Sequence, residues 1–146
     1  MARTMTTSER ENFLAQPHIG VLSVTSDDDR PPLTVPVWYA YQPGGNITFF
    51  TGSEGRKARK TTLLERAGRL SFCVQNPEPP YRYVTVEGTV IGADRSPSVE
   101  DVAAIAGRYL PADVARGLAE NEAANDTGTL VLFTVRPDRW LSADFG

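Results

Sequence analysis

A short basic segment, residues 52–60, has the residue types and spacing that suit a phosphate-binding site. It follows an expected strand and opens an expected helix, so backbone N–H groups at the helix start can point at an anion. Ser53 adds a hydroxyl, Arg59 can bind two phosphate oxygens through its planar guanidinium, and Lys60 adds a mobile point charge. A solvated basic helix face would show the same charge run, and the residues alone leave both interpretations open.

Charge is unevenly distributed along the chain. Residues 54–71 carry a net charge of +4 and residues 87–126 carry −5, while the whole chain carries −3. The overall acidity argues against a dedicated nucleic-acid-binding protein. The basic segment still motivates a nucleic-acid-binding barrel as a third class of function, whose binding would fall steeply with added salt.

Aromatic residues on two expected strands form a second candidate site. Trp38 and Tyr39 on one strand, with Tyr81 and Tyr83 on another, can line a pocket for a flat ligand or can simply fill a barrel core. Pro36 has no backbone N–H, so one side of its strand must be an edge, a bulge or open. An unpaired strand exposes backbone groups that can hydrogen-bond to a ring.

The chain has few side chains for acid–base, nucleophilic or metal chemistry. It contains one histidine, His18, and one cysteine, Cys73, and it lacks GxGxxG, GxxxxGK[ST], GxSxG and HExxH. His18 is interpreted as a satisfied histidine at a strand start, Cys73 as inert packing, and residues 27–29 as a solvated acidic turn. No catalytic residue and no metal ligand is assigned, so a cofactor is expected to supply any chemistry.

Six strands and four helices are expected to position these residues. Strands are predicted over residues 18–25, 31–41, 47–51, 69–75, 81–92 and 129–135. A first helix is predicted after the capping box of Thr6 and Glu9, and a second over residues 56–66. Ser98 is expected to cap a third helix, and Pro111 to start a fourth, with Val114 and Leu118 as its apolar stripe. Short turns between most strands predict a mainly β fold, an antiparallel six-stranded barrel with helices inserted after its third and fifth strands.

Length and composition fit one ordinary globular domain. The chain has 146 residues, of which 40% are hydrophobic and 23% charged, and the prediction is a single domain over residues 1–146. No apolar run is long enough to cross a bilayer, and the first residues lack the apolar core of a signal peptide. We therefore expect a cytoplasmic protein without a membrane partner.

The order of these elements resembles the split-barrel flavin and deazaflavin oxidoreductases, the pyridoxamine-phosphate-oxidase-like superfamily. The matching segments, from Phe13 to Trp140, are IGVLSV, RPPLTVPVWYAY, PGGNITFFTGSEGRKARKTTLLERAGRLSFCV, YRYVTVEGTVIGA and VRPDRW. The most specific part is the RK-x-x-x-L helix followed by an R-[VL] strand, here Arg59-Lys60, Leu64 and Arg69-Leu70. The chain departs from the pattern at Leu63, where the family usually has Asn, and at Ala67-Gly68, where it usually has Asp/Asn-Pro.

The resemblance implies an FMN-binding type of split barrel, a homodimer with a cofactor in a groove between subunits, and a small-molecule substrate. By position, Arg59 and Lys60 would hold a cofactor phosphate, with Thr51, Ser53 and Lys57 nearby. Residues Pro36, Val37 and Trp38 would lie along the tricyclic ring, Tyr83 (or Tyr81) would reach the ring or the substrate, and Trp140 would cover the site from the partner subunit.

For the cofactor, the resemblance favours the deazaflavin F420 over FMN. The Arg- and Ala-rich composition suits an F420-producing host, and this short form with YRYVTVEG is closer to the F420-type branch. The expected function is an F420-dependent reductase that transfers a hydride to a conjugated C=C or similar acceptor. The alternatives are an FMN-dependent oxidoreductase of the same family and a non-catalytic flavin- or haem-binding module.

Overall fold

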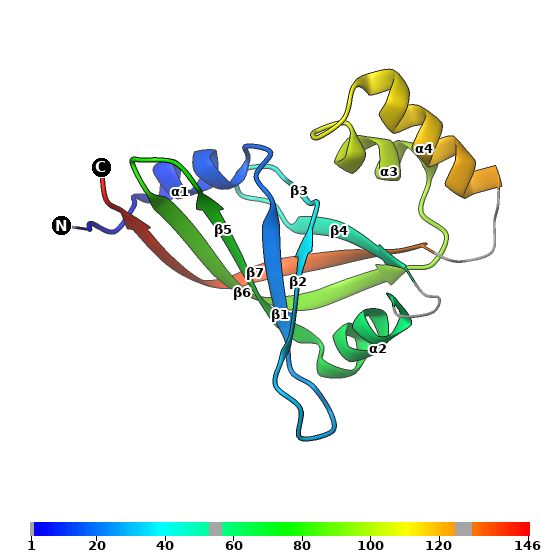
Figure 1. The fold of residues 1–146 in the computed structure, drawn as a ribbon, viewed down its shortest axis with the longest axis horizontal. Coiled ribbons are helices and arrows are strands. Elements are labelled where there is room, and N and C mark those ends of the chain that lie inside the picture. The colour runs from blue at the N-terminus through cyan, green and yellow to red at the C-terminus, as the bar shows by residue number, and fades with distance from the viewer. Residues whose placement is uncertain (1, 53–56, 125–129) are drawn as a thin grey trace.

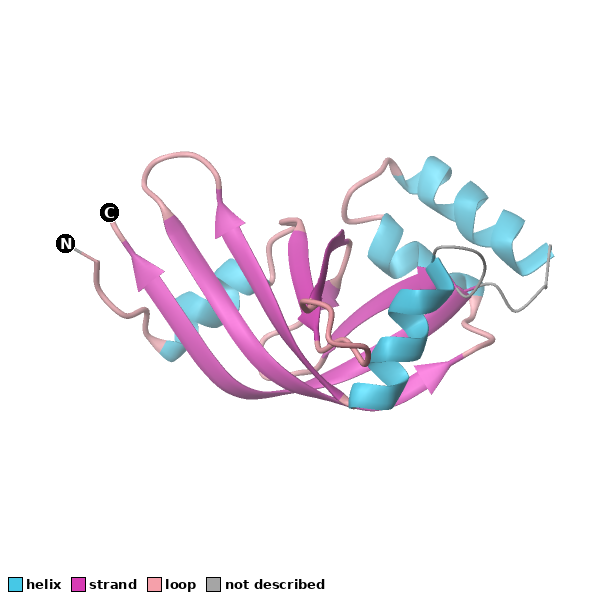
Figure 2. Cartoon of the chain, turned by 60° about the horizontal axis from the view of Figure 1, so that its bottom comes forward, coloured by secondary structure: helices cyan, strands magenta, loops and turns pink. Residues whose placement is uncertain are grey.

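Seven antiparallel strands form the body of the molecule in a computed structural model that describes residues 2–52, 57–124 and 130–146. The strands are β1 (Gly20–Val24), β2 (Leu33–Val37), β3 (Ala40–Tyr41), β4 (Ile47–Gly52), β5 (Arg69–Asn76), β6 (Arg82–Asp94) and β7 (Leu130–Asp144). They hydrogen-bond in the order β2-β1-β5-β6-β7-β4-β3. Figure 1 shows the sheet with its helices set around it, and Figure 2 shows the strands curving into a trough.

Four helices accompany these strands in the described part of the chain. They are α1 (Thr7–Leu14), α2 (Lys57–Ala67), α3 (Val99–Ala106) and α4 (Ala112–Ala124). Helix α2 connects β4 to β5, and the α3–α4 pair connects β6 to β7 and projects beyond the sheet (Figure 1). No helix in the described ranges is long and apolar enough to cross a membrane.

The two outermost strands of the sheet, β2 and β3, are neighbours along the chain. Only Trp38 and Tyr39 separate the end of β2 from the start of β3. The curled sheet therefore has its two open edges at one place in the sequence, which is the geometry of a split barrel. The fold class expected from the sequence is confirmed.

Strands β6 and β7 are long and bend together, so that each serves both halves of the barrel. Their register shifts between Glu87 and Gly88 and again between Val90 and Gly92, and such bulges bend a strand. Gly88 also lets the strands approach closely, because an added Cβ there would lie 2.4 Å from Cγ1 of Val135.

The core lies inside the trough and follows the alternation of the strands. Inward residues of β1, β5 and β6 are buried, while Val21, Ser71 and Glu87, which alternate with them, point outward. The largest fully buried side chains are Tyr39, Phe49, Phe72 and Phe133, and the Phe49 ring stacks on both Phe72 and Phe133.

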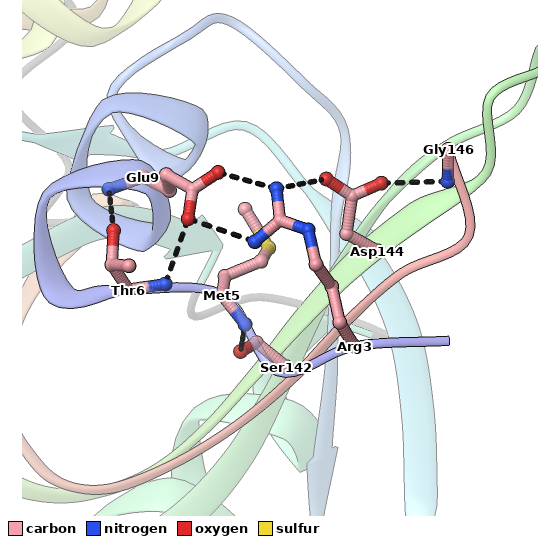
Figure 3. A network of polar contacts seen from close by, with 7 residues as sticks. All are labelled: Arg3, Met5, Thr6, Glu9, Ser142, Asp144 and Gly146. Carbon is pink, nitrogen blue, oxygen red and sulfur yellow. Dashed lines mark hydrogen bonds and ion pairs between the residues drawn. The ribbon is translucent and has the colours of Figure 1, made fainter. Parts of the chain in front are cut away.

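The N-terminal segment is tied to the end of β7 by a polar network (Figure 3). The Arg3 guanidinium donates to Glu9 at 2.6 Å and to Asp144 at 3.1 Å, and the Met5 amide donates to Ser142 Oγ at 3.1 Å. The capping box expected from Thr6 and Glu9 is present at the start of α1.

Three sequence-based expectations are corrected by the structure. The predicted strand 31–41 is broken at Trp38 and Tyr39, so the sheet has seven described strands rather than six. The last strand continues to Asp144 instead of ending at Val135. On α4, Val114 and Leu118 are exposed, and the buried face consists of Ala115 and Ala119, whose small side chains let α4 approach α3 closely.

Candidate functional site

Strand β2 leaves one side of its backbone open. Among the described strands it pairs with β1 alone, with Pro36 opposite Val21 and Val37 opposite Gly20. Pro36 is exposed and Val37 is buried. The edge predicted from Pro36 is confirmed, because proline is tolerated where its missing N–H would face an open side.

Beyond β2, the indole of Trp38 is held in a stack. The Tyr109 ring, which follows α3, lies 5.0 Å from the Trp38 ring with an angle of 10° between the planes. The Tyr109 hydroxyl donates to the His18 carbonyl at 2.7 Å and accepts from the Tyr39 amide at 3.2 Å. Burial raises the pKa of Tyr109, so this phenol stays neutral and keeps its proton for the carbonyl.

Arg108, the neighbour of Tyr109, contacts the same bend. Its guanidinium donates to the Tyr39 carbonyl and to the carbonyls of Ala15 at 2.9 Å and Gln16 at 2.8 Å. It also lies 4.7 Å from the centre of the Tyr39 ring. Arg108 and Tyr109 therefore hold together the β2–β3 bend and the segment between α1 and β1.

Tyr39 itself belongs to the core rather than to an open pocket. Its ring is fully buried, and its hydroxyl donates to the Leu14 carbonyl at 2.6 Å. Burial raises the pKa of Tyr39 strongly, which keeps the phenol protonated. Of the two aromatic residues predicted on this strand, Trp38 is the half-buried one that a ligand can reach.

At the other end of β2, helix α2 packs beside the β1–β2 turn. Arg59 Nη2 donates to Ser26 Oγ at 2.9 Å, and Ser26 in turn donates to Asp28 at 2.7 Å. This bond to the Ser26 hydroxyl holds the pKa of Asp28 below its usual value. One turn or more further along α2, Arg66 pairs with Asp27 of the same turn. A guanidinium has five N–H donors, so Arg59 can be positioned by Ser26 and still bind an anion.

Thr51 ties β4 to α2 through a buried chain of hydroxyls. Thr61 Oγ1 donates to the Gly52 carbonyl at 2.7 Å, so the 2.6 Å contact between Thr51 and Thr61 must have Thr51 as its donor. Both threonines are almost fully buried. Thr51, predicted near the phosphate, thus fixes the position of α2.

The remaining predicted residues near the phosphate are less fully described. Ser53 lies outside the described residues, and Lys57 is the first residue of α2, with a side chain outside the description. Lys60 follows Arg59 in the first turn of α2 and is half-buried.

Tyr83 and Trp140 lie away from β2. Tyr83 points outward from β6, where it lines a hollow of about 270 Å³ with Gln75, Tyr81 and Phe145. Trp140 packs within its own chain, edge-on to Tyr41 at 6.3 Å and 4.3 Å from the Arg10 guanidinium. The structure therefore places Pro36 and Val37 on β2, Trp38 directly after that strand and Arg59 near its start. Tyr83 and Trp140 lie elsewhere on the sheet.

The open edge of β2 has a cationic side chain near its start and an aromatic side chain just after its end. Arg59 lies at the turn that precedes β2, and Trp38 directly follows the strand. At about 3.3 Å per residue, the strand separates these ends by about 16 Å. An elongated ligand with a flat ring and a phosphate group can lie along such an edge.

Sequence reasoning missed three residues that organise this edge: Ser26, Arg108 and Tyr109. Tyr109 carries a signal, since it continues the apolar spacing of Val102, Ile105 and Ala106 yet has a hydroxyl that needs a partner when buried. Ser26 and Arg108 carry no such signal in the sequence, because their hydrogen-bond partners come from distant parts of the chain.

Comparison with known proteins shows which family the chain belongs to. The family model described as pyridoxamine 5'-phosphate oxidase matches residues 6–143, which is nearly the whole chain. The chain belongs to the pyridoxamine 5'-phosphate oxidase family. Membership supports, in general terms, an oxidoreductase with a flavin-type binding fold.

Solved structures of other proteins share the fold of this family member. An F420 reductase superposes with a TM-score of 0.69 and 23% identity, over 90% of this chain and 94% of that one. A conserved hypothetical protein of Mycobacterium tuberculosis superposes with a TM-score of 0.75 and 21% identity, over 97% of this chain and 86% of that one. An FAD-binding protein of Mesorhizobium loti superposes with a TM-score of 0.65 and 20% identity, over 99% of this chain and 96% of that one. No curated protein matches the sequence significantly.

Proposed function

We propose that this chain is a reductase that uses F420 to transfer a hydride to a conjugated C=C or similar small-molecule acceptor. The observation that carries the proposal is the open edge of β2, with Arg59 at its start and the stacked Trp38 at its end. The edge offers unpaired backbone groups and an aromatic surface to a flat ring, and a guanidinium to a phosphate, so the residues present fit a cofactor of this kind.

In this proposal the residues of α2 bind the phosphate group. Arg59 is held by Ser26, and Lys60 follows it at the start of the helix, where the helix dipole favours an anion. Ser53, between β4 and α2 in the sequence, and Lys57, the first residue of α2, are proposed to contribute as well. Thr51 acts through Thr61, because the buried hydroxyl pair sets where α2 begins relative to β4.

The residues of β2 and the bend after it orient the ring. Reduced F420, when bound, supplies the hydride, and the protein supplies position and exclusion of water. The backbone of Pro36 and Val37 would run beside the ring, and Trp38 would limit how far the ring can slide because Tyr109 holds its indole. Tyr83 is proposed to reach the ring or the substrate, and Trp140 to cover the site of a partner subunit, in a cytoplasmic homodimer.

F420 is preferred to FMN for two reasons. The sequence is similar in its YRYVTVEG segment to the F420-type branch, and one of the structural neighbours that cover nearly the whole chain is an F420 reductase. The FAD-binding neighbour gives some support to the alternative, an FMN-dependent oxidoreductase.

Titration of the purified protein with F420 and with FMN, followed by absorption and fluorescence, tests the cofactor. We expect tighter binding of F420, and a yellow protein that releases FMN on denaturation would overturn that preference. Oxidation of reduced F420 is then measured with a panel of enones. Tight binding without oxidation by any acceptor would favour a binding module over a reductase.

A further inference from the structure

The β1–β2 turn brings one of its three aspartates close to the guanidinium of Arg59. Arg59 Nη2 donates to Ser26 Oγ at 2.9 Å, and Ser26 Oγ donates to Asp28 Oδ1 at 2.7 Å. The two charged groups are therefore no farther apart than the combined length of these bonds, which is inside the range of about 6 Å over which charges interact strongly. The bond from Ser26, together with the positive charges of Arg30 and Arg59, holds the pKa of Asp28 below its usual value. Asp28 thus carries a negative charge at neutral pH.

The other two aspartates of this turn have different surroundings. Asp27 forms an ion pair with Arg66, which compensates its charge. Asp29 has a φ of 59°, and its side chain has no hydrogen bond or ion pair within the described residues. Asp28 is therefore the aspartate of the turn whose charge is linked to Arg59.

An anion bound by Arg59 would be repelled by the carboxylate of Asp28. A guanidinium is only a few ångströms across, so an anion that accepts from another of its N–H groups lies within about 10 Å of Asp28, the screening length in 0.1 M salt. The repulsion is proportional to the charge of the anion. It therefore opposes the binding of a dianion about twice as strongly, in free energy, as that of a monoanion.

The two candidate cofactors differ in this charge. The phosphate of FMN is a monoester, which carries about −1.5 to −2 at pH 7. The phosphate of F420 is a diester, which has one ionisable oxygen and so a single negative charge. A carboxylate beside the phosphate-binding guanidinium disfavours FMN more than F420 for this reason.

We propose that Asp28 is a specificity-determining residue that makes the phosphate site prefer a diester to a monoester. The proposal rests on the proposed function, because it takes Arg59 as a ligand of the cofactor phosphate. Asp28 selects by repulsion, which weakens the binding of both phosphates but weakens that of the monoester more. The choice of F420 over FMN is then made in part at the phosphate end of the β2 edge, away from the ring.

Fluorescence titration with three ligands that share one ring tests the role of Asp28. Riboflavin has no phosphate, riboflavin 5'-methyl phosphate is a diester, and FMN is a monoester that is a dianion at pH 8, since its second pKa is about 6. Asp28→Asn keeps an oxygen that accepts from Ser26 but removes the charge. At pH 8 we expect it to tighten FMN binding about tenfold and diester binding about threefold, because a doubled charge squares the effect. Riboflavin binding should not change, and F420, itself a diester, should gain about threefold.

Asp29→Asn is the matched control for the loss of one charge. It makes the same change at the next position of the turn, and asparagine tolerates the positive φ there. We expect it to change the binding of each ligand by less than about twofold, because an exposed charge without a link to the site is screened. Thermal melting of both variants without ligand checks that they fold.

Each other result would overturn the proposal in a different way. Equal effects of Asp28→Asn and Asp29→Asn would replace it with general electrostatic repulsion. Weaker binding of both phosphates by Asp28→Asn would instead make Asp28 a residue that positions Arg59. If the natural protein binds F420 but Asp28→Asn changes FMN and diester binding by the same factor, the specificity role alone is wrong. If the natural protein binds neither F420 nor any of the three flavins, the proposed function is wrong as well.

Discussion

The ring of Tyr109 lies nearly parallel to the indole of Trp38, 5.0 Å away, and its hydroxyl bonds both to the Tyr39 amide in the β2–β3 bend and to the His18 carbonyl before β1. A residue that follows α3 thus sets the position of Trp38, the aromatic side chain at the end of the open edge of β2. The α3–α4 pair is inserted between β6 and β7, and the segment between its two helices places Arg108 and Tyr109 against the bend.

Removing the Tyr109 hydroxyl should loosen the bend without removing the stack. We expect Tyr109→Phe to lower the free energy of unfolding by about 1–3 kcal/mol, because the buried Tyr39 amide and His18 carbonyl lose a partner. Tyr109→Leu should cost about 1 kcal/mol more through loss of the stack. Urea denaturation measures both.

Trp38 fluorescence separates the two effects. In a Trp140→Phe background, Trp38 is the remaining tryptophan. Its emission should change little in Tyr109→Phe and clearly in Tyr109→Leu. Identical spectra for the two variants would contradict a role for the stack.

The proposed phosphate contacts can be separated from general electrostatic attraction. Arg59→Gln and Lys60→Gln should each weaken cofactor binding at least about tenfold, because a charged hydrogen bond to phosphate contributes about 1.5–3 kcal/mol. Arg66→Gln serves as the matched control, since Arg66 lies in the same helix but is paired with Asp27. Calorimetric titration of the three variants should show a gap between the first two and the third, and equal losses would contradict a specific phosphate site.

The hydroxyl chain of Thr51 and Thr61 should show coupling in a double-mutant cycle. Thr61→Val leaves both the Thr51 hydroxyl and the Gly52 carbonyl without their partner, and we expect a loss of about 1–3 kcal/mol. The double variant Thr51→Val/Thr61→Val should cost less than the sum of the single changes, because it leaves no unpaired hydroxyl. Additive losses in chemical denaturation would contradict the chain of bonds.

Glu9 makes the stability of the N-terminal segment depend on pH. Hydrogen bonds from Arg3 and from Thr6 hold the pKa of Glu9 at about 2, compared with an ordinary value of 4.5. Because the folded pKa is the lower one, the stabilisation is complete above pH 4.5 and is lost as the pH falls toward about 2.

Glu9→Gln tests this dependence, since glutamine keeps the cap but carries no charge and cannot form an ion pair with the Arg3 guanidinium. Thermal melts should show the natural protein more stable than the variant near neutral pH. The difference should shrink as the pH falls below 4.5, and a constant difference would rule out the ion pair as its source.

Local signals predicted those parts of the fold that local chemistry decides. Thr6 with Glu9 and Ser98 with Asp101 marked helix starts because the capping bonds span three residues. Pro36 marked an edge because a missing N–H is a property of one residue. The resemblance to split-barrel oxidoreductases then supplied the family, which the family match confirms.

Contacts between distant segments decide the parts of the fold that the sequence did not predict. The break at Trp38 and Tyr39 depends on Arg108 and Tyr109, some seventy residues away. The predicted last strand stops at residue 135, yet residues 136–140 continue β7 because β6 offers them partners, such as the 2.5 Å bond from Thr89 to Asp138. On α4, spacing identified an apolar stripe, but not that α3 would bury its alanines instead.

The position of β7 has a consequence for how the chain folds during synthesis. Although β7 is the last of the described strands in chain order, it lies inside the sheet and pairs with both β6 and β4. Until it emerges, β4 has only the two-residue β3 as a partner, and one side of β6 stays open. Unpaired strand edges of this kind pair with other chains, so the nascent protein is prone to aggregation until β7 has been synthesised and has paired.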